Sequence, residues 1–156
     1  MITVADILRE KRDTRIITMR MHETVATAAL IMQRENISSV VVQDVVETEG
    51  ATVIGVFSER DVARALVEHG PATPGLAVAT FMKRALVSCA LGDSLLTVLR
   101  QMTAHQIRHL PVMEDHALVG VLSATDLMRH YLHEGETHAY AGVHAGELAA
   151  GLTALR

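Results

Sequence analysis

The feature that most constrains this chain is an internal repeat. Residues 54–70 align without gaps on residues 119–135, which pairs the segment GVFSERD with the segment GVLSATD at an offset of 65. Upstream the offset becomes 70, because the first copy has five extra residues in its turn QDVVETEGA. Two copies nearly exhaust the 156 residues, so the chain is expected to fold as two similar units.

Each copy predicts the same order of elements. The apolar runs 16–19 and 86–89 are too short for helices and predict buried strands. Apolar residues at i, i+3, i+4 and i+7 from Val25 and from Leu95 predict two amphipathic helices. The runs 39–46 and 51–57, and again 109–113 and 117–122, are separated by short polar turns and predict hairpins.

A helix is expected to follow each hairpin. Ser58 and Ser123 stand three residues before Asp61 and Asp126, a spacing typical of capping boxes, and the helices are predicted to end at Gly70 and Gly135. The predicted class is therefore α+β, with two β-α-β-β-α units. One unit of about 60 residues buries only a modest apolar surface, so the two must pack together. The predicted divisions are 1–72, 73–135 and a tail, 136–156, that forms a short helix or is mobile.

Composition excludes several classes. A net charge of −4 gives no overall attraction for nucleic acid, and no apolar run is long enough to span a membrane. A single cysteine allows no internal disulfide, which favours a soluble cytoplasmic protein. The nucleophile, phosphate-loop, dinucleotide and zinc-protease motifs are missing from the sequence, so we expect no enzyme.

Histidines and the lone cysteine are weaker candidates for chemistry. His130 and His133 lie three residues apart on a predicted helix, but no third ligand is spaced beside them, so we expect them to be solvated and predict no metal. Cys89 could be a redox thiol, although a buried inert thiol is the simpler interpretation.

The repeated serine and aspartate have both a structural and a functional interpretation. They could simply cap their helices. A capped helix start also offers N–H groups to an anion, and a nearby carboxylate can accept two hydrogen bonds from a sugar diol. These are the requirements of a nucleotide, and both residue types recur at the same offset.

The repeat, the RHLPV segment at 108–112 and the paired GVFSERD and GVLSATD motifs resemble the CBS domain, here as a stand-alone tandem pair or Bateman module. The resemblance covers residues 3–135. It implies that the two units pack sheet to sheet about a pseudo-twofold axis and leave two clefts for adenine nucleotides. AMP is the first expectation, with ADP, ATP, NAD and S-adenosylmethionine as alternatives.

The resemblance also implies which residues bind the ligand. One cleft would combine Ser123, Thr125 and Asp126 with Ile17, Ile37, Ser38 and Ser39. The other would combine Ser58, Arg60 and Asp61 with Val87, Ile107, Arg108 and His109. The aspartates would accept hydrogen bonds from ribose, and the serine and threonine hydroxyls would donate to phosphate.

Two departures make the clefts unequal. Repeat 1 lacks a counterpart of Pro111, and Arg60 stands where repeat 2 has Thr125. We therefore expect the cleft with Arg60, Arg108 and His109 to favour more phosphate charge.

The predicted function is a non-catalytic sensor that signals nucleotide occupancy to an unknown partner protein. A homodimer is expected through apolar helix faces, with those around Met32 and Met102 as candidates. Two alternatives remain: a ligand-free scaffold, and a single-stranded RNA binder, which is disfavoured because the chain has only two Phe, two Tyr and no Trp.

Overall fold

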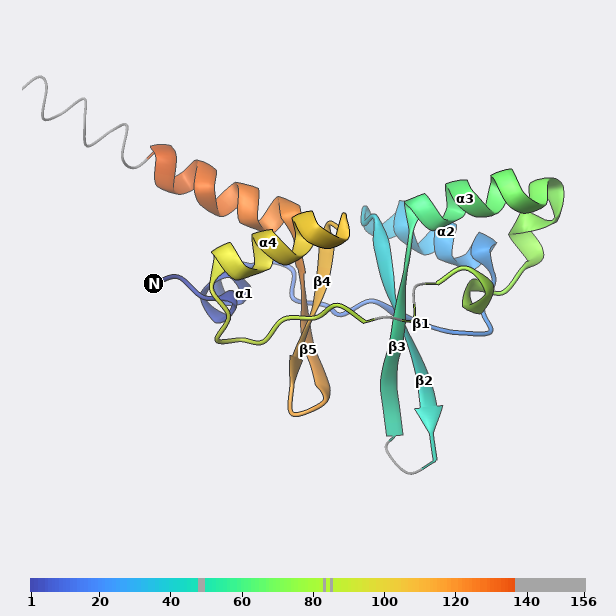
Figure 1. The fold of residues 1–156 in the computed structure, drawn as a ribbon, viewed down its shortest axis with the longest axis horizontal. Helices are drawn as coiled ribbons and strands as arrows, with labels where there is room; N and C mark the ends of the chain where they lie inside the picture. The colour runs from blue at the N-terminus through green and yellow to red at the C-terminus, as the bar shows by residue number, and fades with distance from the viewer. Residues whose placement is uncertain (48–49, 83, 85, 137–156) are drawn as a thin grey trace, which may run out of the picture.

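Two similar units lie side by side in the computed structural model, which describes residues 1–47, 50–82, 84 and 86–136 (Figure 1). The predicted tail, 136–156, lies outside these residues except for position 136. The elements are α1 (Val4–Glu10), β1 (Thr18–Arg20), α2 (Val25–Glu35), β2 (Ser39–Val46), β3 (Gly50–Ser58), α3 (Glu59–His69), the 3-10 turns η1 (Gly70–Gly75) and η2 (Val78–Thr80), α4 (Leu95–His105), β4 (His109–Glu114) and β5 (Ala117–Ser123). A further helix covers 124–136.

The first unit is a three-stranded sheet covered by α2 and α3. The strands have the order β1-β2-β3, with β1 parallel and β3 antiparallel to β2. Val40, Val42 and Phe57 are fully buried between this sheet and the helices. The predicted hairpin and both predicted helices are confirmed, and α2 begins at Val25 because the Thr24 side chain accepts a hydrogen bond from the N–H of Thr27.

The second unit repeats this order around the β4-β5 hairpin, but its first strand is reduced to one bridge. Cys89 donates its N–H to Pro111 O and accepts from Met113 N–H, pairing with Val112 in parallel. The predicted strand 86–89 is therefore wrong. The next upstream bond of a parallel ladder would need an N–H at Pro111, which proline lacks, whereas Val41 stands at the equivalent place in β2.

The final helix also differs from the prediction. It starts after Ser123 as expected, but Gly135 is helical and does not end it. Gly70 ends α3 with a φ of +54° and is followed by Pro71, which cannot donate the next helical hydrogen bond. Gly135 is followed by Glu136, which can, so the helix continues to the limit of the described residues.

Each unit completes its core with a segment from elsewhere in the chain. Val4 and Ile7 of α1 are buried with the second unit, whereas Val78, Phe81 and Met82 of the connecting segment are buried with the first. Matching antiparallel bridges fix the two segments, Thr3 to Ser94 and Thr24 to Ala77. The two units thus exchange equivalent pieces.

The two sheets occupy the middle of the molecule and the helices lie toward its ends, as the α+β class with two packed β-α-β-β-α units predicts (Figure 1). Met32 and Met102 are both only 5% exposed, each inside the core of its own unit. The prediction that their helix faces form a dimer interface is therefore wrong. Within the described part of the chain, no helix is long and apolar enough to cross a membrane.

Candidate functional site

A cavity of about 410 Å³ opens where the two units meet. It is lined from both units by Ser38, Ser39, Val56, Ser58, Glu59, Arg60, Asp61, Leu86, Val87, His105, Gln106, Ile107, Arg108 and His109. Seven of these are the residues predicted for one cleft, namely Ser58, Arg60, Asp61, Val87, Ile107, Arg108 and His109. The repeat thus brings together side chains that lie about 50 residues apart in the sequence.

The first unit contributes the junction between β3 and α3. The Asp61 Oδ2 atom accepts hydrogen bonds from the Ser58 N–H at 2.9 Å and from the Ser58 hydroxyl at 3.0 Å. Arg64 Nη2 donates to the Asp61 Oδ1 atom at 2.7 Å and to Phe81 O at 3.0 Å. Asp61 is only 2% exposed, so this capping box and ion pair hold its carboxylate rigidly at the cavity wall.

The second unit contributes the turn after α4. This helix ends with Gln106 in the left-handed conformation, at φ 53°, and the Ile107 N–H donates back to Met102 O. The turn places Ile107, Arg108 and His109 at the cavity. Two bonds join the units across it: Arg60 Nη1 donates to Gln106 O at 3.2 Å, and Ser38 Oγ lies 3.2 Å from His109 Nδ1.

The fixed positive charge of the cavity comes from arginine. Arg60 and Arg108 are exposed residues of its lining, whose two carboxylates are Glu59 and the Arg64-paired Asp61. Burial, with the charges of Arg108 and Lys11, lowers the pKa of His109 to about 4. His109 is therefore neutral at physiological pH and contributes hydrogen bonds rather than charge.

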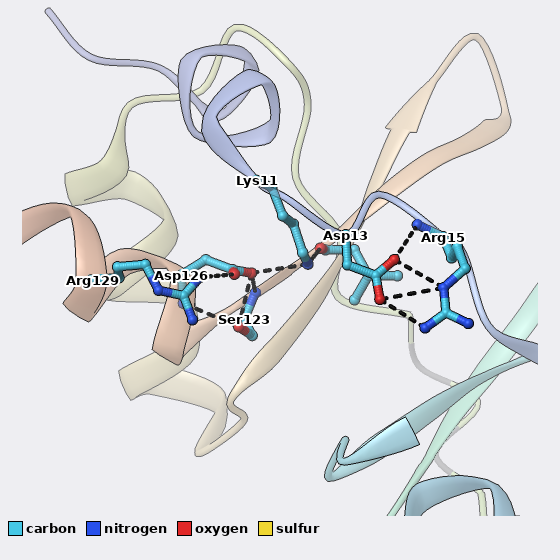
Figure 2. Close-up of polar contacts among 7 residues, drawn as sticks. Lys11, Asp13, Arg15, Ser123, Asp126 and Arg129 are labelled. Atoms are coloured by element: carbon cyan, nitrogen blue, oxygen red, sulfur yellow. Dashed lines mark hydrogen bonds and ion pairs between the residues drawn. The ribbon is translucent and has the colours of Figure 1, made fainter. Parts of the chain in front are cut away.

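The second predicted cleft is assembled differently. Asp126 Oδ2 accepts from the Ser123 N–H and hydroxyl, both at 2.8 Å, and from the Lys11 ammonium at 3.1 Å (Figure 2). Burial alone would raise the pKa of Asp126, but the Ser123 donors and Lys11 outweigh it and the pKa is lowered. Arg129 Nη1 lies farther away, 3.9 Å from Asp126 Oδ1.

The remaining predicted residues of that cleft have different surroundings. Ser38 and Ser39 line the cavity with Asp61, and Ser38 also meets His109, which pairs with Ser123 in the β4-β5 hairpin. Ile17 and Ile37 pack against the core of the first unit, and Thr125 is exposed at the start of the final helix. Hairpin β2-β3 turns the two serines toward the second unit, where Ser38 meets His109.

Sequence reasoning missed five lining residues: Val56, Glu59, Leu86, His105 and Gln106. Val56 and Glu59 lie inside the GVFSERD motif and could have been included from it. The sequence also held a signal for a turn at Gln106, because this residue aligns with Asn36 at the repeat offset of 70. In the structure both residues end their helices with positive φ. Asparagine is among the residues that favour this conformation.

The weaker candidates have structural roles. His130 is not solvated as predicted: it is 7% exposed, and its Nδ1 lies 3.5 Å from Glu10 Oε2. Burial and the nearby charge of Asp93 raise the pKa of the Cys89 thiol to about 12, which keeps it protonated and unreactive at neutral pH. No group of three or more potential metal ligands occurs among the described residues.

Comparison with known proteins identifies the family. The model of the CBS domain matches twice, at residues 4–68 and 78–133. The chain belongs to the CBS domain family. Both matches fall on the repeats defined by the sequence, and the cavity lies between the two CBS domains.

Relatives of this CBS pair extend from plants to bacteria. It is 27% identical over 137 residues to the CBS domain-containing protein CBSX3, mitochondrial, of Arabidopsis thaliana, covering 85% of this chain and 66% of the plant protein. The chain thus spans just under two thirds of that relative. A CBS-domain containing protein from Agrobacterium tumefaciens has a TM-score of 0.74 at 28% identity, covering 81% of this chain and 91% of that one. The CBS domain pair of protein MJ0100, in complex with 5-methylthioadenosine and S-adenosyl-L-methionine, has a TM-score of 0.72 at 22% identity, covering 86% and 98%.

Proposed function

We propose that this CBS pair is a non-catalytic regulator that binds an adenine nucleotide, AMP in the first instance, in the cavity lined by Asp61. Occupancy of the cavity is then passed to a partner protein. The observation that carries the proposal is the cavity itself, which combines the GVFSERD motif of the first repeat with the turn after α4 in the second. Its volume of about 410 Å³ lies in the range of small-molecule sites.

The lining suits a nucleotide better than an uncharged nucleoside. Leu86, Val87 and Ile107 offer an apolar wall for a base, and the turn at 106–109 offers backbone groups to its edge. Arg60 and Arg108 can each bind phosphate oxygens through two N–H groups. The related pair of protein MJ0100 binds adenosine compounds, which supports this ligand class. S-adenosylmethionine lacks phosphate and carries a sulfonium cation, so the two arginines favour AMP, ADP, ATP or NAD over it.

Signalling follows from the position of the cavity between the units. A ligand that contacts both the β3-α3 junction and the turn after α4 binds one relative arrangement of the units better than another, and so shifts their population. The Arg60–Gln106 and Ser38–His109 contacts are the bonds that such a shift would change.

A homodimer is the form in which we propose the regulator acts. Leu66 and Val67 of α3 are 51% and 88% exposed, and their repeat counterparts Tyr131 and Leu132 are 49% and 68% exposed. The repeat therefore places the same apolar pair twice on the helical surface, which suits pairing with a second copy about a twofold axis. This surface replaces the buried faces of Met32 and Met102 as the candidate interface.

One set of binding experiments distinguishes this regulator from the two alternatives, a ligand-free scaffold and a single-stranded RNA binder. Thermal unfolding is measured with AMP, ADP, ATP, NAD and S-adenosylmethionine in turn, followed by titration calorimetry of any ligand that raises the midpoint. A specific nucleotide regulator shows a midpoint that rises with AMP concentration, and the double variant Arg60→Met/Arg108→Met loses most of that rise.

No rise with any of the five compounds would contradict the proposal and favour a ligand-free scaffold. Salt-sensitive binding of single-stranded RNA would favour the third class, although the cavity lining contains no Phe, Tyr or Trp on which a base could stack.

A further inference from the structure

The two equivalent ends of the repeat have different surroundings: the Asp61 end lines the cavity, whereas a lysine from outside the motif reaches the Asp126 end. The repeat offset of 65 pairs Val56, Ser58 and Asp61 with Val121, Ser123 and Asp126. The first three residues line the cavity. At the second three, the Lys11 ammonium donates to Val121 O at 2.9 Å and to Asp126 Oδ2 at 3.1 Å. The Lys11 ammonium thus bonds to residues near both ends of the GVLSATD motif.

Lys11 is held there by the helix that precedes it. It is the last residue of the α1 capping region, and its N–H donates to Ile7 O. The helix itself is fixed on the second unit, because Val4 and Ile7 are buried there and the Val4 and Ala5 N–H groups donate to Asp93 O and Leu91 O. The Lys11 side chain is 23% exposed, so the segment presents its ammonium inward (Figure 2).

The segment after Lys11 is tied in the other direction. Arg15 forms ion pairs with Asp13 at 2.8 Å and with Glu35 of α2 at 3.1 Å. These contacts join the segment to the first unit just before β1. Lys11 therefore lies between α1, which is fixed on the second unit, and the Asp13–Arg15 pair, which is tied to Glu35 of the first. Figure 2 shows Lys11 between Asp126 and that pair.

The Asp61 end is neutralised in another way. Its cation, Arg64, comes from α3 itself, three residues along, and also donates to Phe81 O. The counterpart Arg129 stays 3.9 Å from Asp126, with its side chain 70% exposed. The second end has exchanged an arginine of its own helix for a lysine that arrives from the N-terminal segment, 115 residues away.

We propose that Lys11 is a built-in occupant of the second nucleotide cleft, so that one chain binds a single nucleotide, in the cavity lined by Asp61. This inference rests on the proposed function, because it names which of the two equivalent clefts is open. The Lys11 ammonium uses the Asp126 oxygen and the Val121 carbonyl that a ribose hydroxyl would otherwise reach. A ligand can enter that half only after Lys11 withdraws.

Calorimetric stoichiometry with AMP tests the inference. The wild type binds one AMP per chain, and Lys11→Met, which keeps the length of the side chain but removes its charge, binds two. Asp61→Asn abolishes binding in the wild-type background and leaves one AMP in the Lys11→Met background. Arg9→Met is the matched control, because it removes an exposed cation from the same helix and leaves the count at one. Circular dichroism confirms that each variant is folded.

Two results would overturn the inference: two AMP molecules bound by the wild type, or one bound by both the wild type and Lys11→Met. Absence of AMP binding in every variant would instead contradict the proposed function. A second measurement, without nucleotide, then decides the role of Lys11.

That measurement is the rate of lysine acetylation by an N-hydroxysuccinimide ester, followed by peptide mass spectrometry. The sequence contains two lysines, Lys11 and Lys83, so the second is an internal standard. Removal of the acceptor charge by Asp126→Asn raises the rate at Lys11 relative to Lys83 by at least fivefold. An unchanged ratio would mean that Lys11 does not occupy the Asp126 site.

Discussion

Replacement of Gly120 by alanine tests whether α1 is built into the second unit. A Cβ atom added at Gly120 would lie 3.0 Å from Leu8 Cδ1 and 3.3 Å from Leu8 Cδ2. Carbon atoms in contact prefer about 3.5–4.0 Å, so Leu8 must move by about half an ångström. Overpacking of this size costs about 1 kcal/mol of unfolding free energy.

The partner of this contact can be removed separately. In a Leu8→Ala background the clashing methyl groups are gone, and Gly120→Ala is then expected to be neutral or to stabilise by about 0.4–1 kcal/mol through the unfolded chain. The double-mutant cycle therefore gives a coupling free energy of about 1–2 kcal/mol between Leu8 and Gly120.

Urea unfolding followed by circular dichroism measures the four proteins of the cycle. Gly75→Ala is the control, since a Cβ there has nothing within 4 Å and the effect should not depend on Leu8. Additive effects of Leu8→Ala and Gly120→Ala would refute the reasoning. They would mean that α1 does not lie on β5 in solution, and the placement of Lys11 would fail with it.

Three further perturbations have defined outcomes. The variants Arg60→Met and Arg108→Met each weaken AMP binding about tenfold by calorimetry while adenosine binding stays unchanged, since each loses a charge-assisted bond to phosphate; equal losses for adenosine would contradict this. His109→Gln flattens the fall of unfolding free energy on acidification from pH 6.5 to 4. In the folded protein the pKa of His109 is about 4, so between pH 6.5 and 4 the unfolded chain binds a proton at this position that the folded protein does not. The unfolding free energy therefore rises with pH in this window, by up to about 3 kcal/mol. Equal pH dependence of the unfolding free energy in the variant and the wild type would refute the assignment. Val67→Glu/Leu132→Glu converts a dimer to a monomer in light scattering, and an unchanged mass would place the interface elsewhere.

The repeat explains why the helices and hairpins were predictable. Each periodic pattern occurs in both repeats, so a pattern that predicts a helix or hairpin in one copy is supported by the same pattern in the other. The α2 and α4 helices begin where their apolar patterns begin, and Ser58 and Ser123 cap the helices that follow the hairpins. Local chemistry decides all of these features, because capping and periodicity act within four residues.

The first strand of the second unit shows where such local reasoning fails. The apolar run 86–89 has the composition of a strand, but strand formation also requires a partner with free N–H groups. Pro111 was noted in the sequence as a difference between the repeats, yet its effect falls on residues more than 20 positions away. Pairing partners have to be known before that effect can be predicted.

The candidate site likewise has a part that the sequence predicts and a part that depends on packing between distant segments. The residues of the Asp61 cleft were predictable from the motif and the resemblance, because aligned positions in a repeat occupy equivalent places. The Lys11 contact was not, since Lys11 lies outside both motifs and meets Asp126 only through the packing of α1. Ser38 and Ser39 line the Asp61 cavity because of where the start of β2 lies in the fold, which local patterns do not determine.

The exchange of α1 and the connecting segment between the two units determines the order in which the molecule can be completed during synthesis. The first unit has every residue of its core once Met82 has left the ribosome. The apolar side of α1 is synthesised before β5 and the final helix, whose Leu122 and Leu127 belong to the same core, and it cannot be covered until they follow. Helix α1 is thus synthesised well before the core that covers it is complete, a delay during which a chaperone or a neighbouring copy has access to Val4 and Ile7.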